Sequence, residues 1–350
     1  MKLEEFDYRL PPDRVAQVPA ARRDASRLLV LDRGSPGVEE AAFASIGDHL
    51  AAGDLLVLND TRVIPARLRC RKSTGGLVEL LLVAREGSDP LGRTWICLAS
   101  ASRGLKSGSR LGIAPGFEAE FLGEAAGGRV RVRLHAEGGD LEGAIERHGT
   151  VPLPPYIRRD GADARDAIDR ERYQTVYARA NGAIAAPTAG LHFTEELLEG
   201  LRARGIGTAA LTLHVGPGTF QPVRSAIVEE HRLLPEAFRL PEETAAAVAG
   251  CRARGGRVVA VGTTVVRVLE ERARGDGRVE PGEGWCGAYI TPGHRFRAVD
   301  ALLTNFHLPR TSLLILVAAF AGRERILAAY EEAIARGLRF YSYGDAMLIL

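Results

Sequence analysis

The chain lacks several features that identify common classes of protein. Its 350 residues include four cysteines, which lie far apart and form no CxxC pair. This spacing argues against a zinc ribbon and against a short disulfide-bonded scaffold. No apolar run reaches the length of about 18 residues that a membrane-spanning helix needs, and the start MKLEEFDYRLPPDR has no apolar stretch of a secretory signal. We therefore expect a cytoplasmic protein without a membrane-spanning segment.

The net charge is also small, and aromatic residues are few. The formal net charge is +2 and aromatic residues make up 6% of the chain, so composition alone does not reveal a nucleic-acid partner. Hydrophobic residues make up 46% of the chain, which is enough for a large core. A length of 350 residues predicts two domains.

The stretch from about Cys70 to His135 is rich in glycine and alternates in hydropathy, as in RVRVRL at 129–134. Alternation places like residues on one face of a strand, so this stretch predicts a small antiparallel β domain. Its arginines at alternate positions are more typical of a solvated strand face than of a stripe that binds RNA. The proline-rich VPLPPYIRR at 151–159 then marks the entry into a second region.

In the second region, helical patterns alternate with short apolar strands. Helices are expected over 195–204, 242–254, about 264–271 and 311–321, with strands at 210–215, 257–262 and 298–303. Thr194 is the expected N-cap of the first of these helices, and Thr263 or Thr264 that of the third. Such alternation favours an α/β domain with a largely parallel sheet. The apolar strand in LLVLNDTR at 55–62 follows the same pattern.

The predicted fold is therefore α/β and discontinuous. The α/β catalytic domain comprises residues 1–65 and 151–350, and a small antiparallel β-barrel domain is inserted at 66–150.

Short polar segments follow the predicted strands. In open α/β sheets, ligands bind outside the carboxyl ends of the strands, where helix amino termini and loop amides converge. Each segment alone is explained by the composition of turns, but their joint occurrence indicates a shared site. The segments are LNDTR (58–62), LHVGPGTF (213–220), VGTTVVR (261–267) and TNFHLP (304–309), with APTAGLHFT (186–194) before a helix.

Three histidines occur in these segments, namely His192, His214 and His307. Histidine exchanges protons near neutral pH, so each is a candidate acid or base as well as a candidate buried hydrogen-bonding residue. Their spacing matches no local zinc motif, and we expect no metal. The GTT turn at 262–264 offers a helix amino terminus to an anion, either a carboxylate or a phosphate.

These segments together resemble the S-adenosylmethionine:tRNA ribosyltransferase-isomerase family of queuosine biosynthesis. The resemblance extends over nearly the whole chain and keeps the order of the motifs. It is carried by SRLLVL (26–31), LNDTRVIPARL (58–68), KSTGGLVELLL (72–82), PLPPYIRR (152–159), YQTVYAR (173–179), AAPTAGLHFT (185–194), LTLHVGPGTFQPVR (211–224), VVAVGTTVVRVLE (258–270), VDALLTNFHLPR (299–310) and YSYGDAMLIL (341–350).

The resemblance implies an enzyme that takes the ribosyl group of S-adenosylmethionine. The expected acceptor is 7-aminomethyl-7-deazaguanine at the wobble position of tRNA, and the expected products are epoxyqueuosine-tRNA, adenine and methionine. S-adenosylmethionine would be a cosubstrate, with no permanently bound cofactor. The expected partner is the anticodon region of tRNA, and the expected state is a monomer.

The chemistry of this family needs a base, a proton donor for adenine and polar groups that hold the ribose. The expected acid and base groups are among Asp60, His192, His214 and His307. The residues expected to position the substrates are Asn59, Arg62, Thr188, Thr219, Glu236, Thr263, Thr264, Arg267 and Asn305.

The chain departs from the family pattern in three places. The usual His-x-Met-His-x-Glu run reads HRLLPE at 231–236, so Leu234 stands where a histidine is expected and only His231 and Glu236 remain. Val265 replaces a common serine, and the Ser-Thr pair after FHLP appears as Thr311-Ser312.

Two alternatives remain open at this point. An S-adenosylmethionine-dependent RNA methyltransferase would also favour an α/β sheet, although its usual glycine-rich loop is not evident. A non-catalytic RNA-binding protein would need basic and stacking residues, and aromatic residues make up only 6% of this chain.

Overall fold

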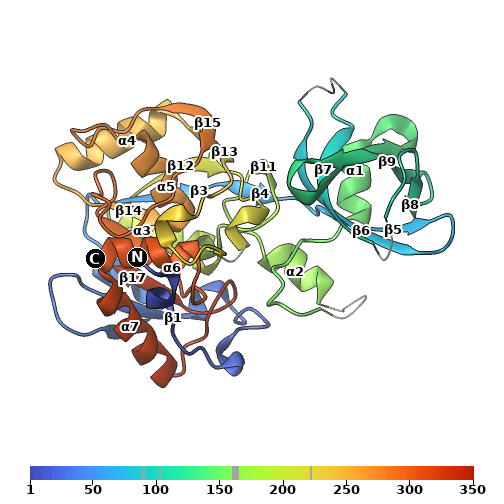
Figure 1. Ribbon diagram of the computed structural model, residues 1–350. Coiled ribbons are helices and arrows are strands. Elements are labelled where there is room, and N and C mark those ends of the chain that lie inside the picture. The colour runs from blue at the N-terminus through green and yellow to red at the C-terminus, as the bar shows by residue number, and fades with distance from the viewer. Residues whose placement is uncertain (88, 90, 102–103, 160–164, 221–222) are drawn as a thin grey trace.

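The computed structural model describes the chain from Met1 to Leu350 except residues 88, 90, 102–103, 160–164 and 221–222. It consists of a large α/β part and a separate β-barrel, joined by the chain segments that lead into and out of the barrel (Figure 1). The barrel strands fall between strands of the large sheet in the sequence, so the α/β part is discontinuous.

The α/β part is built on one nine-stranded sheet. From one edge to the other its strands are β15 (Gly282–Cys286), β13 (Glu236–Leu240), β12 (Gly207–Leu213), β3 (Leu55–Asn59), β14 (Val258–Val261), β16 (Ala301–Asn305), β17 (Ala346–Ile349), β1 (Arg27–Leu31) and β2 (Glu39–Ala42).

The sheet is mixed, so the expectation of a largely parallel sheet is wrong. Pairing is parallel through β12, β3, β14 and β16 and between β17 and β1. It is antiparallel for β13, β15 and β2 at the edges and between β16 and β17. The alternation of helix and strand indicated only the central crossovers, because antiparallel neighbours need no helix between them. The central parallel strands therefore end at one common edge.

The sheet is buried on both faces, which explains its continuous apolar strands. In β3, Leu55 and Val57 pack into one hydrophobic cluster, whereas Leu56 and Leu58 pack into another on the opposite face. Helices α4 (Glu242–Ala253), α5 (Thr263–Arg272), α6 (Ser312–Ala321) and α7 (Arg323–Ala335) contribute to the first cluster, and α3 (Glu195–Ala203) to the second.

The barrel is closed and wholly antiparallel. Its strands are, in order around it, β10 (Arg129–Ala136), β7 (Thr94–Ala101), β6 (Leu77–Arg85), β5 (Arg67–Lys72), β8 (Arg110–Ala114) and β9 (Phe117–Ala125). The inserted barrel and the mixed sheet confirm the predicted fold class, while boundaries at exactly 66 and 150 stay a prediction.

The arginines that alternate along the barrel strands face solvent beside carboxylates. Arg131 lies 3.4 Å from Glu86, and Arg110 lies 2.5 Å from Glu118. Such exposed pairs contribute about 0–1 kcal/mol each. Their balance of charge agrees with a solvated strand face.

Four further elements come before or after the barrel in the sequence. The chain enters and leaves the barrel side by side, since Arg67 and Thr150 exchange two backbone hydrogen bonds of 3.1 and 2.9 Å. Strands β4 (Thr61–Val63) and β11 (Ala180–Ala183) pair in parallel nearby, and helices α1 (Leu141–His148) and α2 (Asp166–Arg172) follow the barrel.

Helix boundaries agree with the sequence pattern at one predicted cap, Thr194, and differ at another, while Thr311 caps the helix that was expected to begin with it. The Thr194 and Thr311 side chains accept hydrogen bonds from Leu197 and Leu314 at the starts of α3 and α6. Helix α5 has Gly262 as its N-cap, with φ of 95° and no side-chain cap, so the expected threonine cap is wrong. Both threonines instead lie in the first turn of α5.

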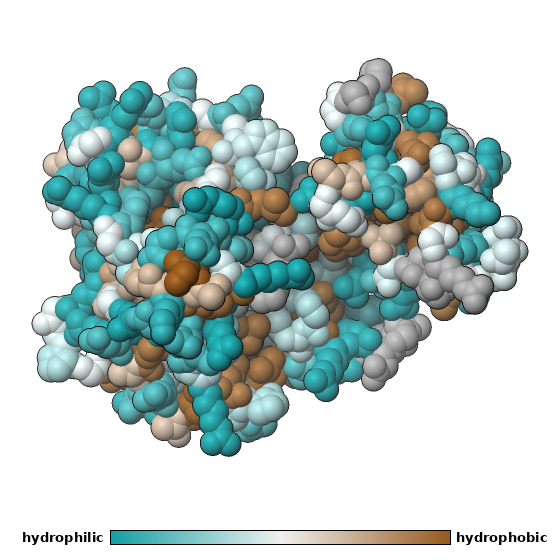
Figure 2. Space-filling view, in the orientation of Figure 1, coloured by the Kyte–Doolittle hydropathy of each residue, from teal (hydrophilic) through white to brown (hydrophobic). Residues whose placement is uncertain are grey.

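The remaining helical segments are short 3-10 turns. They span Leu3–Phe6, Pro12–Arg14, Arg23–Ala25, Phe43–His49, Ala126–Gly128, Glu137–Gly139, Thr188–His192, Pro217–Phe220 and Val228–Glu230. Within the described part of the chain, no helix is long and apolar enough to cross a membrane. Hydrophilic residues cover most of the face shown in Figure 2.

The junction between the parts leads to a prediction about stability. A Cβ atom at Gly149 would lie 1.9 Å from the carbonyl oxygen of Pro65, so we expect Gly149→Ala to destabilise the fold by about 1–3 kcal/mol. A Cβ at Gly200, in the exposed interior of α3, meets nothing within 4 Å. Gly200→Ala is the matched control and should stabilise by about 0.5–1 kcal/mol. Equal unfolding midpoints of the two variants in guanidinium chloride would contradict this account.

Candidate active site

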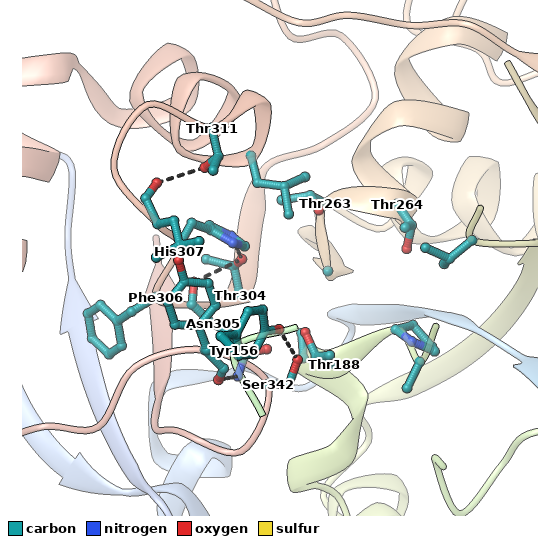
Figure 3. Close-up of a pocket in the computed structure, with 18 of the residues that line it drawn as sticks. Tyr156, Thr188, Thr263, Thr264, Thr304, Asn305, Phe306, His307, Thr311 and Ser342 are labelled. Atoms are coloured by element: carbon teal, nitrogen blue, oxygen red, sulfur yellow. Dashed lines mark hydrogen bonds between the residues drawn. The ribbon is translucent and has the colours of Figure 1, made fainter. Parts of the chain in front are cut away.

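A pocket of about 350 Å³ lies beyond the carboxyl ends of β14 and β16. This volume is within the range of roughly 300–1,000 Å³ that is usual for small-molecule sites. Its walls come from distant parts of the sequence, as Figure 3 shows for the labelled side chains. The lining residues are 155–156, 186–189, 215, 262–264, 304–308, 311, 313 and 341–342.

The parallel strands explain why the pocket forms here. Strand β16 ends at Asn305 and β14 at Val261, and the chain turns into the pocket wall after each. The first turn of α5 contributes Thr263 and Thr264, whose side chains are buried. The amide groups of a helix's first turn have no partner within the helix and carry a partial positive charge, so this wall suits an anion.

Asn305 stands at the centre of a buried hydrogen-bond network. Its Nδ2 donates to Nε2 of His192 at 3.1 Å and to the carbonyl oxygen of Tyr341 at 3.1 Å. On the other side of the His192 ring, Nδ1 lies 2.7 Å from Oγ of Ser26. Among the described residues, Oδ1 of Asn305 is buried and has no hydrogen-bond partner.

His307 lies in the pocket wall and is held from one side. Its Nε2 lies 2.7 Å from Oγ1 of Thr304, whose hydroxyl in turn donates to the carbonyl oxygen of Asn305 at 3.4 Å. Nε2 of His307 is therefore the ring nitrogen that the protein holds, and its short contact with Thr304 fits either direction of donation. Burial lowers the pKa of His307 to about 3, so its ring is neutral at neutral pH.

His192 is also neutral, but it lies outside the pocket lining. Burial, together with the nearby cations Arg339 and Arg23, lowers its pKa to about 3. Both ring nitrogens are hydrogen-bonded, to Ser26 and to Asn305.

Asp60 and His214 lie away from this pocket, next to one another. Asp60 accepts hydrogen bonds from Thr212 at 2.6 Å and Arg179 at 2.5 Å, and it lines a separate polar pocket. Nδ1 of His214 lies 2.8 Å from Oγ1 of Thr61. Burial lowers the pKa of His214, and the Asp60 carboxylate opposes that shift.

Three predicted site residues bind other protein groups behind the pocket. Asn59 donates to the Leu213 carbonyl at 3.0 Å and to Oγ1 of Thr264 at 3.2 Å, which ties β3 to β12 and α5. Arg267 and Glu236 form a buried ion pair, and Glu236 also accepts from the Gly216 amide at 2.7 Å.

Thr188 lines the pocket, as do Thr263, Thr264, Asn305 and His307. Arg62 is exposed, and the side chain of Thr219 lies outside the described residues. The structure therefore brings five of the predicted site residues into one cavity.

Sequence reasoning missed an aromatic pair in the pocket wall. The rings of Tyr156 and Tyr341 have centroids 4.1 Å apart, and the Tyr156 hydroxyl lies 2.6 Å from Oγ of Ser342. Their motifs, PLPPYIRR and YSYGDAMLIL, were noted only for the resemblance, because neither follows one of the four strand ends considered. Tyr341 has a positive φ of 76°, which no sequence pattern signalled.

Of the three departures from the family pattern, two lie outside the pocket lining and the third lies in it. Leu234 is 42% exposed, and Val265 is fully buried in the larger core cluster. Thr311 lines the pocket and caps α6. The exchange of serine for threonine at this position therefore keeps a hydroxyl group.

Comparisons with known proteins agree over the full length. A family model described as queuosine biosynthesis protein matches residues 3–349. The S-adenosylmethionine:tRNA ribosyltransferase-isomerase of Anaeromyxobacter sp. (strain Fw109-5) is 56% identical over 349 residues, covering 100% of this chain and 99% of that protein. The protein of the same name from Citrifermentans bemidjiense is 53% identical over 349 residues, covering 100% of both chains.

A solved structure has a similar fold. The crystal structure of S-adenosylmethionine tRNA ribosyltransferase from Thermotoga maritima matches with a TM-score of 0.55 and 38% identity, covering 99% of this chain and 100% of that one.

The buried neutral histidines predict sensitivity to acid. His192 and His307 have a pKa of about 3 in the folded chain, below the ordinary 6.5. Between these values only the unfolded chain binds the protons, so stability is fully present above about pH 6.5 and is lost as the pH falls toward 3.

Between pH 7 and pH 5 the free energy of unfolding should fall in both proteins. We expect the fall to be smaller in His192→Gln than in the wild type, by about 2 kcal/mol. Urea denaturation at each pH measures this, with the exposed His148→Gln as the control. Parallel pH dependence of wild type and His192→Gln would refute the assignment.

Proposed function

The chain belongs to the queuosine biosynthesis family of S-adenosylmethionine:tRNA ribosyltransferase-isomerases, and we propose that the pocket at the ends of β14 and β16 is where its reaction takes place. The enzyme uses S-adenosylmethionine and tRNA as substrates. The acceptor in this proposal is 7-aminomethyl-7-deazaguanine at the wobble position in the anticodon region. The products are epoxyqueuosine-tRNA, adenine and methionine.

The family supports ribosyl transfer over the two alternatives. The relatives are named for ribosyl transfer and isomerisation, and not for methylation. A non-catalytic RNA-binding protein would have no need of a cavity that combines a neutral histidine, a buried unpaired amide oxygen and a helix amino terminus. This combination in one cavity is the observation that carries the assignment of the site.

His307 is the residue that we propose as the base. A sulfonium centre acidifies the C5′ hydrogens beside it, so the reaction needs a group in the pocket that is unprotonated and can accept one of them. A positive charge on this group would repel the sulfonium, and burial keeps the imidazole neutral. Thr304 holds the ring through Nε2 and leaves Nδ1 to the substrate.

The first turn of α5 suits the carboxylate of the methionine moiety. Thr263 and Thr264 add hydroxyl groups to the backbone amides of this turn, and Thr188 faces the pocket from another segment (Figure 3). Asn59 orients Thr264 through its amide, while Glu236 and Arg267 hold the loop at Gly216.

Asp60, His214 and Arg62 are proposed for contact with the tRNA acceptor, because they lie outside the cavity near the junction with the barrel. Thr219 stays a predicted substrate contact. The reaction needs proton transfer and hydrogen bonding only, so we propose no permanently bound cofactor. The monomeric state and the cytoplasmic location stay predictions.

The reaction itself is the first test. Incubation of the protein with S-adenosylmethionine and tRNA carrying the deazaguanine precursor should release adenine and methionine, and digestion of the tRNA should yield epoxyqueuosine by mass spectrometry. The same tRNA with guanine at the wobble position is the control and should give neither. Formation of S-adenosylhomocysteine would instead establish methyl transfer.

His307 provides a second test. We expect His307→Ala to lower kcat by about 10²–10⁴-fold, the usual contribution of general acid–base catalysis. His148→Ala, at the exposed end of α1, should retain full turnover. The assignment fails if a folded His307→Ala keeps wild-type kcat.

A further inference from the structure

The amide of Asn305 is oriented by two groups, one on each side of its Nδ2 atom. Both the His192 ring and the Tyr341 carbonyl lie 3.1 Å from Nδ2. A backbone carbonyl is only an acceptor, so the group that faces it must be the NH2 end of the amide. The Tyr341 carbonyl therefore excludes the flipped amide, which would bring two oxygen atoms together.

The tautomer of His192 follows from the same network. Because Nδ2 of Asn305 donates, Nε2 of His192 must accept, and Nδ1 must carry the proton. That proton is donated to Oγ of Ser26 at 2.7 Å, while the Ser26 hydroxyl donates to the carbonyl oxygen of Arg23 at 3.4 Å. Each hydrogen bond from the Arg23 carbonyl to the Tyr341 carbonyl thereby has one donor and one acceptor.

The strained backbone of Tyr341 is a second indication that the orientation of the Asn305 amide has a function. A φ of 76° is unusual for a bulky residue and costs on the order of 1–3 kcal/mol. The strain is offset by the ring contact with Tyr156 and by the hydrogen bond from the Tyr341 amide to the Phe306 carbonyl at 3.2 Å. This conformation brings the Tyr341 carbonyl to Asn305.

One polar atom is left over. Oδ1 of Asn305 is buried and forms no hydrogen bond with any described residue. Asn305 itself lines the pocket (Figure 3). An unpaired buried acceptor costs about 1–3 kcal/mol, and a donor of a bound molecule would recover this once a shift of the pocket wall uncovers the atom.

We propose that His192 is a positioning residue: together with the Tyr341 carbonyl it orients the Asn305 amide, so that Oδ1 accepts a hydrogen bond from an N–H or O–H group of S-adenosylmethionine. His192 exchanges no proton with the substrate, because both of its ring nitrogens are committed to protein groups. This inference rests on the proposed function, since it assigns the pocket to that substrate.

Three single variants and one double variant test the inference. Glutamine at position 192 offers one acceptor to Asn305 and one donor to Ser26, so His192→Gln should keep KM for S-adenosylmethionine and kcat within about threefold. His192→Phe preserves the shape of the ring but removes both hydrogen bonds, and it should raise KM about tenfold, as should Asn305→Ala. The double variant His192→Phe/Asn305→Ala should be no worse than Asn305→Ala alone, because His192 acts only through Asn305.

Three results would overturn the proposal. They are additive losses in the double variant, a His192→Gln enzyme as impaired as His192→Phe, or loss of a limb of the wild-type pH profile of kcat/KM in His192→Gln. Circular dichroism confirms the fold of each variant, and Asn305→Ala keeps the test valid if His192→Phe does not fold. The binding affinity for S-adenosylmethionine, measured by calorimetry, must weaken in parallel with KM.

A failure of the proposed function would be recognised separately. If the wild type binds S-adenosylmethionine but forms no epoxyqueuosine, the reaction assignment fails, and the order of affinities among the variants still tests the role of His192.

Discussion

The site depends on the parallel alignment of β12, β3, β14 and β16. Parallel strands carry their carboxyl ends to the same edge, so the polar residues that follow each strand converge although they are distant in sequence. Asn59 reinforces this edge, because its amide binds both the Leu213 carbonyl and Thr264. A slip in the pairing of β3 would displace the wall formed by α5 and reverse which side chains of β3 face each core cluster.

Burial keeps His192 and His307 uncharged at neutral pH, and their hydrogen bonds distinguish them. His192 and His307 have similarly lowered pKa values, yet their hydrogen bonds differ. His192 is bonded through both ring nitrogens, to Ser26 and Asn305, whereas His307 is held through Nε2 by Thr304. The charge state alone does not separate these roles, and the hydrogen-bond partners do.

The mixed sheet also shows why the arrangement tolerates departures from the family pattern. Leu234 lies on the surface just before β13, an antiparallel strand outside the parallel centre. Glu236, two residues further along, is retained and buried against Arg267, where it holds the Gly216 loop. The ion pair is the feature of this segment that the pocket depends on, because an unpaired buried charge would be costly.

The sequence by itself determined the fold class, the family and the strand-end motifs. Hydropathy period and turn composition are local, and the order of ten motifs is a property of the chain alone. It did not determine that half of the sheet's pairings are antiparallel, because a strand has the same apolar pattern whichever way it runs beside its neighbour. Nor did it separate His307 from His192 or include Tyr156 and Tyr341 in the site. The two ring nitrogens of His192 are bonded to residues more than a hundred positions away in the sequence. The position of the Tyr341 carbonyl depends on a backbone with positive φ. Only the tertiary structure decides both.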